Sequence, residues 1–266
     1  MLEDRRGILY PERLPSFHRL PAPTALAHAV HWFWIPEWQL QPGEISRQEV
    51  LPHPACNVVV DPEGVRLVGP PTRRSERVLS GTGWTIGALL KPAAVPALLP
   101  DPSRARDTEQ PIAEPTLHRV VSTAMTAADL SSDARRAAAS VALTDWFLSR
   151  LPPLSAEGEL ANALGQLLAD PSITQVADLA PRLHTSTRTL QRVASHYFGL
   201  TLHSMIRRRR LQEGAKRLRT DPTLSITNLA SELGYSDHAH FTTDFTKVLG
   251  VSPRDFRGSE PLIVDD

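Results

Sequence analysis

The chain has 266 residues, enough for two domains; 41% of them are hydrophobic, and 29 basic and 29 acidic residues leave no net charge. Its single cysteine, Cys56, excludes an intramolecular disulfide and a multi-cysteine zinc site. No stretch approaches the roughly 20 apolar residues of a membrane span, and the first residues lack the apolar core of a signal peptide, so we expect a cytoplasmic protein without membrane contact.

Residues 1–110 are expected to form short strands and turns. Nineteen of the 24 prolines precede residue 161, and proline interrupts helix interiors and central strands. Residues 57–69 predict two strands around a turn, and residues 83–90 predict another strand. The tryptophan-rich sequence suggests an apolar ligand pocket lined by Trp32, Trp34 and Trp84, although tryptophans also build cores.

From residue 116 the pattern becomes helical. Residues 116–151 are rich in alanine and carry apolar side chains at helical spacing. These helices could form a dimerisation surface or pack on their own domain. Pro152 and Pro153 end the second helix. We therefore place a sensor or dimerisation domain at residues 1–152, a second domain at residues 155–258 and an acidic tail at residues 259–266.

The second domain contains an internal repeat. A shift of 50 positions aligns Leu179 with Leu229, Ala180 with Ala230 and Leu183 with Leu233. Each copy predicts a short amphipathic helix, a turn and a second helix, which is a helix-turn-helix unit. Pro181 should shorten or bend the first helix of the first copy.

Charge is distributed unevenly between the two parts. Residues 1–170 hold 16 Lys/Arg and 19 Asp/Glu, whereas residues 171–258 hold 13 and 7. A basic domain within a neutral chain is the electrostatic pattern of a protein that binds phosphate backbones. Residues 155–258 are therefore expected to bind a phosphate backbone.

At these positions the chain resembles the AraC/XylS family of bacterial transcription regulators. The resemblance lies in "STRTLQR" (186–192), "RL" (210–211), "LASELGYSDHAHF" (229–241) and "GVSPRDFR" (250–257). It implies that the partner is double-stranded DNA and that a seven-helix DNA-binding domain places two recognition helices in successive major-groove segments. The N-terminal pattern, including "YPERLPS" and "GWTIGALLKP", is similar to an uncharacterised β-rich domain of some regulators in this family. Whether it forms a cupin-like barrel stays open.

The expected fold class is α+β in two domains. A mixed, β-rich N-terminal domain with a helical segment (β-rich 1–110, helical 116–151) precedes an all-α, seven-helix, double helix-turn-helix domain. The chain is expected to be a transcription regulator and not an enzyme; an activator is the expected type, and the sequence leaves the choice between activation and repression open.

Base edges are read from the outer face of a recognition helix near its start. In the first copy this face carries Thr187, Arg188, Gln191 and Arg192; arginine pairs with guanine and glutamine with adenine through two hydrogen bonds. In the second copy it carries His238, Ala239, Thr242 and Thr243. Many family members have Arg where Thr243 stands and Lys where Thr246 stands, so we predict weaker discrimination by the second helix.

Phosphate contacts are expected next to the recognition helices and on the helix that joins the two units. The predicted phosphate-contacting residues are Ser186, Arg207, Arg208, Ser236, Thr246 and Lys247. Successive residues of a helix turn by about 100°, so the four arginines of 207–210 cannot all face the DNA.

Three alternatives stay open for the N-terminal domain. A metal-dependent, enzyme-like site would need clustered histidines with a carboxylate, whereas the histidines here are scattered; we expect no catalytic residue, metal or cofactor. Cys56 could be a redox switch or a buried apolar residue near a strand start. The domain could sense a small-molecule effector or serve assembly alone, as a homodimer. RNA polymerase is a further expected partner.

Overall fold

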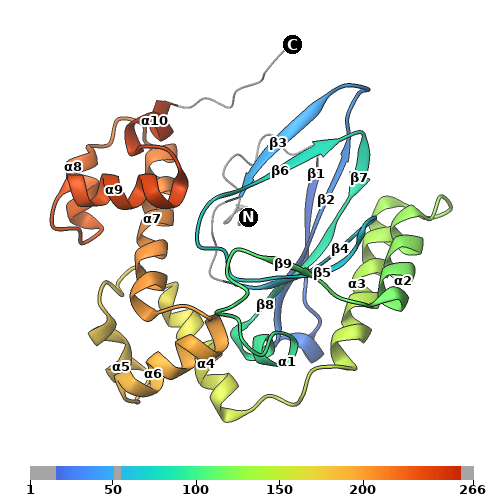
Figure 1. The fold of residues 1–266 in the computed structure, drawn as a ribbon, viewed down its shortest axis with the longest axis horizontal. Helices are drawn as coiled ribbons and strands as arrows, with labels where there is room; N and C mark the ends of the chain where they lie inside the picture. Colours follow the sequence, from blue (N-terminus) through green and yellow to red (C-terminus); the bar gives the residue numbers. More distant parts are fainter. Residues whose placement is uncertain (1–15, 51–54, 259–266) are drawn as a thin grey trace.

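The computed structural model describes residues 16–50 and 55–258 (Figure 1). The predicted acidic tail and the "YPERLP" stretch lie outside these residues. The larger of two sheets has the strand order β1-β2-β8-β4-β5-β9, with β7 also paired to β2. Its strands are β1 (Ser16–Pro21), β2 (Val30–Gln39), β4 (Asn57–Asp61), β5 (Gly64–Val68), β7 (Thr82–Trp84), β8 (Ile86–Leu90) and β9 (Glu109–Pro111). The smaller sheet pairs β3 (Ile45–Val50) with β6 (Ser75–Ser80).

The two strand predictions are confirmed with one refinement. The predicted hairpin is β4 and β5, with Asp61 opposite Gly64 at the turn. The segment 83–90 contains two strands, β7 and β8, because the chain leaves the ladder at Thr85 while both strands remain paired to β2. The tryptophan-rich segment forms β2, in the interior of the sheet.

Two antiparallel helices, α2 (Pro115–Thr126) and α3 (Ser132–Leu148), cover one face of the sheet (Figure 1). Ser131 directly precedes α3, and its side chain accepts a hydrogen bond from the Ala134 N–H and so caps the helix. Phe33 and Ile35 of β2 belong to the same buried core as Phe147 of α3. Short turns η2 (Thr24–Leu26), η3 (Pro92–Ala94) and α1 (Val95–Leu98) close one end of this core.

The rest of the described chain is helical. Residues 151–155 carry no helix or strand and connect α3 to α4. Seven α-helices follow within residues 156–258, together with the 3-10 turn η4 (Val176–Asp178) and the π-helical turn η5 (Ala194–Phe198). They are α4 (Ala156–Leu168), α5 (Leu179–Arg182), α6 (Thr187–Val193), α7 (Leu202–Thr220), α8 (Ile226–Glu232), α9 (His238–Leu249) and α10 (Pro253–Gly258). The α+β fold with a helical C-terminal region is therefore as expected. In the described parts, no helix is both long and apolar enough to cross a bilayer.

The internal repeat reappears in the backbone hydrogen bonds. Leu183 N–H donates to the Leu179 carbonyl at 3.1 Å, and Leu233 N–H donates to Leu229 at 3.0 Å. The turn residue that follows has a positive φ in both copies: 48° at His184 and 75° at Gly234. The first copy thus makes the same left-handed turn without glycine. The effect predicted for Pro181 is also confirmed, because residues 176–182 are divided into the 3-10 turn η4 and the four-residue α5, whereas the matching residues of the second copy form the seven-residue α8.

The helical region has two hydrophobic cores, which meet along α7. The first includes Leu164, Leu190 and Ile206, and the second includes Leu211 and Phe245. We call residues 156–206 lobe 1 and residues 211–258 lobe 2. The four arginines of residues 207–210 lie on α7 between the two lobes.

Candidate nucleic-acid interface

The predicted base-reading residues of the first unit lie on one exposed side of α6. Leu190 and Val193 are fully buried in lobe 1 and fix the orientation of the helix. Ser186 caps α6, since its Oγ accepts a hydrogen bond from the Thr189 N–H at 3.1 Å. The side chains that this arrangement leaves exposed include those of Thr187, Arg188, Gln191 and Arg192.

One of these exposed arginines already has a partner. Arg192 forms an ion pair with Glu157 at the start of α4, and its side chain stays 62% exposed. An exposed pair contributes little to stability, so a guanine or a phosphate can displace the carboxylate at small cost. The spacing of the first copy gave no sign of this pair, because Glu157 lies outside the repeat.

The second unit presents its predicted residues in the same way. The side chain of Asp237 accepts a hydrogen bond from the His240 N–H at 2.7 Å and caps α9. This bond is the largest cause that holds the pKa of Asp237 below its usual value. Phe241 and Phe245 anchor the helix in lobe 2. The outer face of α9 holds the predicted residues His238, Ala239 and Thr243, all exposed, and Thr242, which is half-buried.

The residues predicted to contact phosphate differ in how exposed they are. Ser186, Ser236, Thr246 and Lys247 are exposed, and Arg207 has a side chain that is 42% exposed. Arg208 is different: only 6% of it is exposed. Burial lowers the pKa of Arg208, and nearby Asp107 of the N-terminal domain acts in the opposite direction. The phosphate prediction for Arg208 is therefore corrected, because the 100° turn between successive helical residues directs it toward the N-terminal domain.

The other arginines of this run also have separate surroundings. Arg207 lies 3.5 Å from Asp244 of α9, and Arg209 donates a hydrogen bond to the Ile173 carbonyl at 2.9 Å. The guanidinium of Arg210 lies 4.2 Å from the centre of the Tyr235 ring, a cation–π contact. The run therefore links α7 to lobe 1, lobe 2 and the N-terminal domain.

The predicted tryptophan pocket is wrong. Trp34 lies opposite Gly87, where a Cβ would be 2.1 Å from the indole, and Trp32 is on the same side of β2. Trp84 is opposite Glu37, whose carboxylate accepts a hydrogen bond from Arg136 of α3 on the helix-covered face. The three tryptophans thus occupy both faces of the sheet and cannot line one pocket.

Cys56 does not have the environment of a reactive thiol. It is 2% exposed and directly precedes β4. Burial raises its pKa to about 12, so the thiol keeps its proton at neutral pH and is a poor nucleophile. Within the described residues, no three or more His, Cys, Asp or Glu side chains are grouped as a metal ion would require.

The N-terminal domain contacts both lobes. In lobe 1, the Asn162 side chain accepts a hydrogen bond from the Ala93 N–H at 3.0 Å and donates one to the His28 carbonyl at 2.8 Å. The contact with lobe 2 is made by Arg74 of the N-terminal domain, whose N–H donates a hydrogen bond to the Val248 carbonyl near the end of α9 at 3.0 Å. The N-terminal domain is therefore hydrogen-bonded to α4 in lobe 1 and to α9 in lobe 2.

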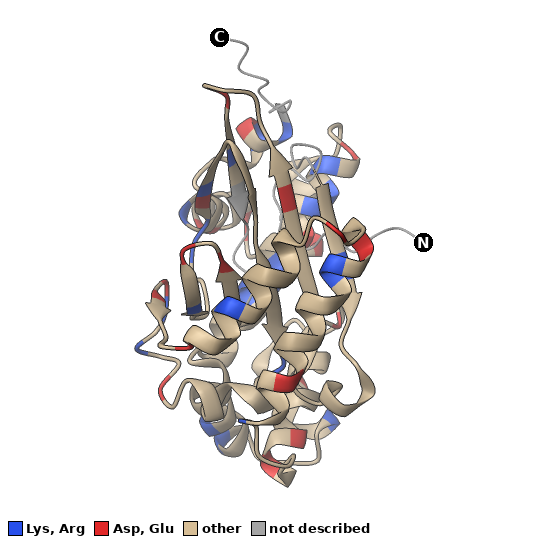
Figure 2. Cartoon of the chain, turned by 90° about the vertical axis from the view of Figure 1, so that its right-hand side faces the viewer, with Lys and Arg blue, Asp and Glu red and all other residues tan. Residues whose placement is uncertain are grey.

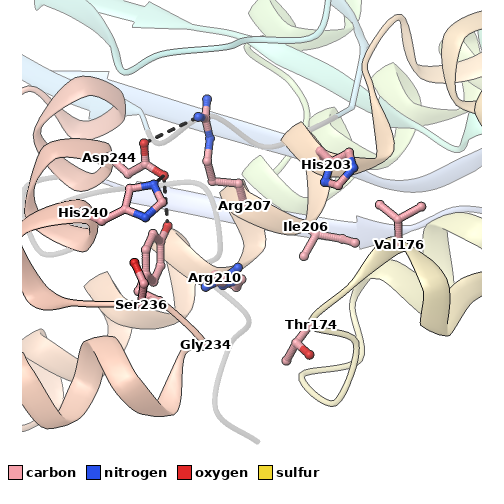
Figure 3. A pocket seen from close by; sticks show the side chains of 11 residues that line it. Thr174, Val176, His203, Ile206, Arg207, Arg210, Gly234, Ser236, His240 and Asp244 are labelled. Atoms are coloured by element: carbon pink, nitrogen blue, oxygen red, sulfur yellow. Dashed lines mark hydrogen bonds and ion pairs between the residues drawn. The ribbon is translucent and has the colours of Figure 1, made fainter.

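A pocket of about 400 Å³ opens between the lobes beside α7 (Figure 3). Helix α7 contributes His203, Ile206, Arg207 and Arg210. The opposite walls are formed by Thr174 and Val176 of lobe 1 and by residues 234–236, His240 and Asp244 of lobe 2. Two of the predicted phosphate contacts, Arg207 and Ser236, thus line the same pocket.

Two protein families match parts of the chain. Residues 179–259 match the family described as a helix-turn-helix domain. Residues 18–109 match a domain of unknown function, DUF6597. The HTH-type transcriptional activator RhaS of Pectobacterium carotovorum is 37% identical over 79 residues, which cover 30% of this chain and 28% of the relative. The protein of the same name from Escherichia fergusonii has the same identity and coverage. The match spans under a third of these relatives.

The solved structures that match the chain are distant from it in sequence. A Chromobacterium violaceum transcriptional regulator with an AraC-type DNA-binding domain is 22% identical, with a TM-score of 0.35 over 40% of this chain and 96% of that one. ToxT from Vibrio cholerae is 12% identical, with a TM-score of 0.42 over 85% of this chain and 98% of that one.

Proposed function

We propose that this protein is a sequence-specific, DNA-binding transcription regulator of the cytoplasm with a C-terminal domain of the AraC type, and the match of residues 179–259 to a helix-turn-helix domain supports this proposal. Its domains are residues 1–152 and 155–258. The unit around α6 and the unit around α9 read successive major-groove segments of one duplex. The observation that carries this proposal is the repeated unit with an anchored, capped and outwardly exposed helix in each lobe.

The dimensions of α7 support this reading. Its 19 residues span roughly 28 Å at 1.5 Å per residue. Successive major-groove segments on one side of DNA are about 34 Å apart. A rigid helix that enters the cores of both lobes can therefore hold two reading helices at a fixed separation near one DNA turn.

Base reading is assigned to specific side chains. Arg188 offers paired hydrogen bonds to guanine, and Gln191 offers them to adenine. Arg192 can contact a guanine in the same way once its ion pair with Glu157 is broken. Thr242 and Thr243 of α9 offer apolar contact to thymine and single hydrogen bonds. Ser186, Ser236, Thr246 and Lys247 position the duplex through its phosphates.

The test is selection of binding sites from randomised DNA with the full-length protein. We expect an enriched site whose two parts lie about 10 base pairs apart. Arg188→Ala should lose preference in one part only. Lys216→Gln serves as a control, because Lys216 is exposed on α7 and belongs to no predicted contact. Enrichment of no sequence, with binding abolished by salt, would contradict sequence-specific recognition.

Control through the N-terminal domain is part of the proposal. The hydrogen bonds at Asn162 and Arg74 tie one domain to both lobes, so a ligand or partner that alters the N-terminal domain can change the relative position of α6 and α9. A small-molecule effector and RNA polymerase are the proposed additional partners. An assembly role without sensing is the alternative, and a thermal-shift screen of metabolite classes against the full chain separates the two.

The outer side of α2 and α3 supports a homodimer. Val120, Val141 and Leu148 are 44%, 57% and 49% exposed. The helical pair faces the viewer in Figure 2, where most of its ribbon is tan and single positions are blue or red. Light scattering at micromolar concentration should give twice the chain mass, and Val141→Glu should reduce it to one chain. A monomeric wild type would leave these helices as a cover for the sheet alone.

A further inference from the structure

We propose that the pocket between the lobes binds a phosphate of the DNA backbone, at the point where the duplex passes from the α6 unit to the α9 unit. This proposal rests on the proposed DNA-reading function and adds a contact site between the two reading helices. The pocket places cationic and hydroxyl groups from α7 and both lobes around one space (Figure 3).

Helix periodicity explains why α7 contributes to the pocket. His203, Arg207 and Arg210 are spaced by four and three residues, so they lie on one side of the helix. Arg208 points elsewhere and is buried. The change from lobe 1 to lobe 2 occurs here, because the two apolar cores end at Ile206 and begin again at Leu211. Between these cores, residues 207–210 are all arginine, whereas α7 contributes apolar side chains to lobe 1 before them and to lobe 2 after them.

The charges of the pocket favour an anion. Two arginines line it, against one carboxylate, that of Asp244, and two histidines add ring nitrogens that can form hydrogen bonds. Asp244 is 7% exposed and lies 3.5 Å from Arg207, while the Tyr235 hydroxyl approaches it at 3.4 Å. The carboxylate of Asp244 therefore lies largely buried in lobe 2. Arg207 remains partly exposed, and its ion pair is long enough to be exchanged for a phosphate oxygen.

The position of the pocket favours a duplex as the source of the phosphate. Ser236 precedes α9 by two residues and its side chain is exposed. His240, on the first turn of α9, is 58% exposed. A backbone that lies along the start of this reading helix can present one phosphate to Ser236, His240 and Arg207 together.

The test compares salt dependence in the full-length chain on its selected DNA site. Each neutralised phosphate contributes about −0.9 to the slope of log affinity against log salt. Arg207→Gln should therefore reduce the slope by about 0.9, so that its deficit relative to wild type shrinks about 3.5-fold between 50 and 200 mM salt. Lys216→Gln removes the same charge from the exposed part of α7 and should leave the slope unchanged.

Two further variants separate binding from folding. Asp244→Asn removes the competing carboxylate and keeps a hydrogen-bond acceptor for Tyr235, so it should tighten DNA binding, whereas a purely structural role would weaken it. His203→Gln should reproduce part of the Arg207→Gln effect. On DNA with one neutral methylphosphonate between the two reading segments, wild type should lose affinity and Arg207→Gln should not.

Each outcome decides the proposal. Equal slopes for Arg207→Gln and Lys216→Gln, with sequence-specific binding intact, would overturn the pocket and leave the proposed function standing. Absence of specific binding by the wild type would overturn both. If inorganic phosphate shifts the imidazole NMR signals of His203 and His240 while Arg207→Gln binds DNA like wild type, the pocket holds a free anion and the DNA contact is wrong.

Discussion

Docking of the N-terminal domain on lobe 1 predicts different effects for two otherwise similar glycines. Gly199 ends η5 with φ +63°, and Gly234 forms the turn before α9 with φ +75°. A Cβ at Gly199 would lie 2.5 Å from the Pro102 carbonyl carbon and 2.6 Å from the Ser103 nitrogen. At Gly234 the nearest atom would be a guanidinium nitrogen of Arg210 at 3.4 Å, which is ordinary contact with a flexible side chain.

The structure sets the magnitude of the difference. Alanine with positive φ costs about 1–2 kcal/mol at either position, partly offset by about 0.4–1 kcal/mol from the less flexible unfolded chain. At Gly199 the backbone of residues 102–103 must also move by about 1 Å, and such overpacking costs about 1–3 kcal/mol. Separation of lobe 1 from the N-terminal domain would remove the clash and avoid this cost. We therefore expect one of two results for Gly199→Ala. Either its free energy of unfolding is lower than that of Gly234→Ala by up to about 3 kcal/mol, or lobe 1 is partly separated from the N-terminal domain.

The assay combines two measurements on the full-length chain. Urea unfolding gives the free energy of each variant, and limited proteolysis reports exposure of the connector at residues 151–155. We expect Gly199→Ala to unfold at lower urea and to be cut faster than Gly234→Ala. Free energies within about 0.5 kcal/mol of each other and equal cutting rates would refute the docking argument.

The remaining predictions concern single sites. Burial raises the pKa of Cys56 to about 12 from 9.0, so the unfolded chain loses this proton first. The stability advantage of wild type over Cys56→Ala should be complete below pH 9 and fall toward pH 12 by up to about 1.4 kcal/mol per pH unit; a pH-independent difference would contradict this. His184→Gly should raise the urea midpoint, because it relieves a φ of 48° that costs about 1–2 kcal/mol in a non-glycine residue; a lower midpoint would show that this strain is absent. Removal of Glu157 by Glu157→Gln should free Arg192 and tighten binding to the selected site at low salt, and electrophoretic titration against Arg192→Ala tests this.

The helical region was the more predictable part, because its signals are local. The 50-residue shift aligns Leu179 with Leu229 by spacing alone, and the backbone hydrogen bonds of the two turns repeat it. The left-handed turn at His184 could not be foreseen, since histidine carries no glycine signal. The ion pair between Arg192 and Glu157 joins segments that the repeat does not relate.

The two predictions that the structure corrects, the tryptophan pocket and the phosphate contact of Arg208, both depend on contacts between distant segments. The faces of Trp34 and Trp84 depend on how β7 and β8 pair with β2, and composition contains no information on that register. Likewise, helical spacing places Arg208 on a different side from Arg207. Only the packed N-terminal domain determines that this side is buried.

The most direct test of the account is a base-by-base affinity scan along the selected DNA site with the full-length protein. The account predicts two clusters of sensitive positions about 10 base pairs apart. In the cluster read by α6, substitutions should cost about 1–3 kcal/mol, and Arg188→Ala should erase part of this penalty; in the cluster read by α9, penalties should be smaller. A single cluster, or equal penalties in both, would contradict two unequal helices that read successive turns of one duplex.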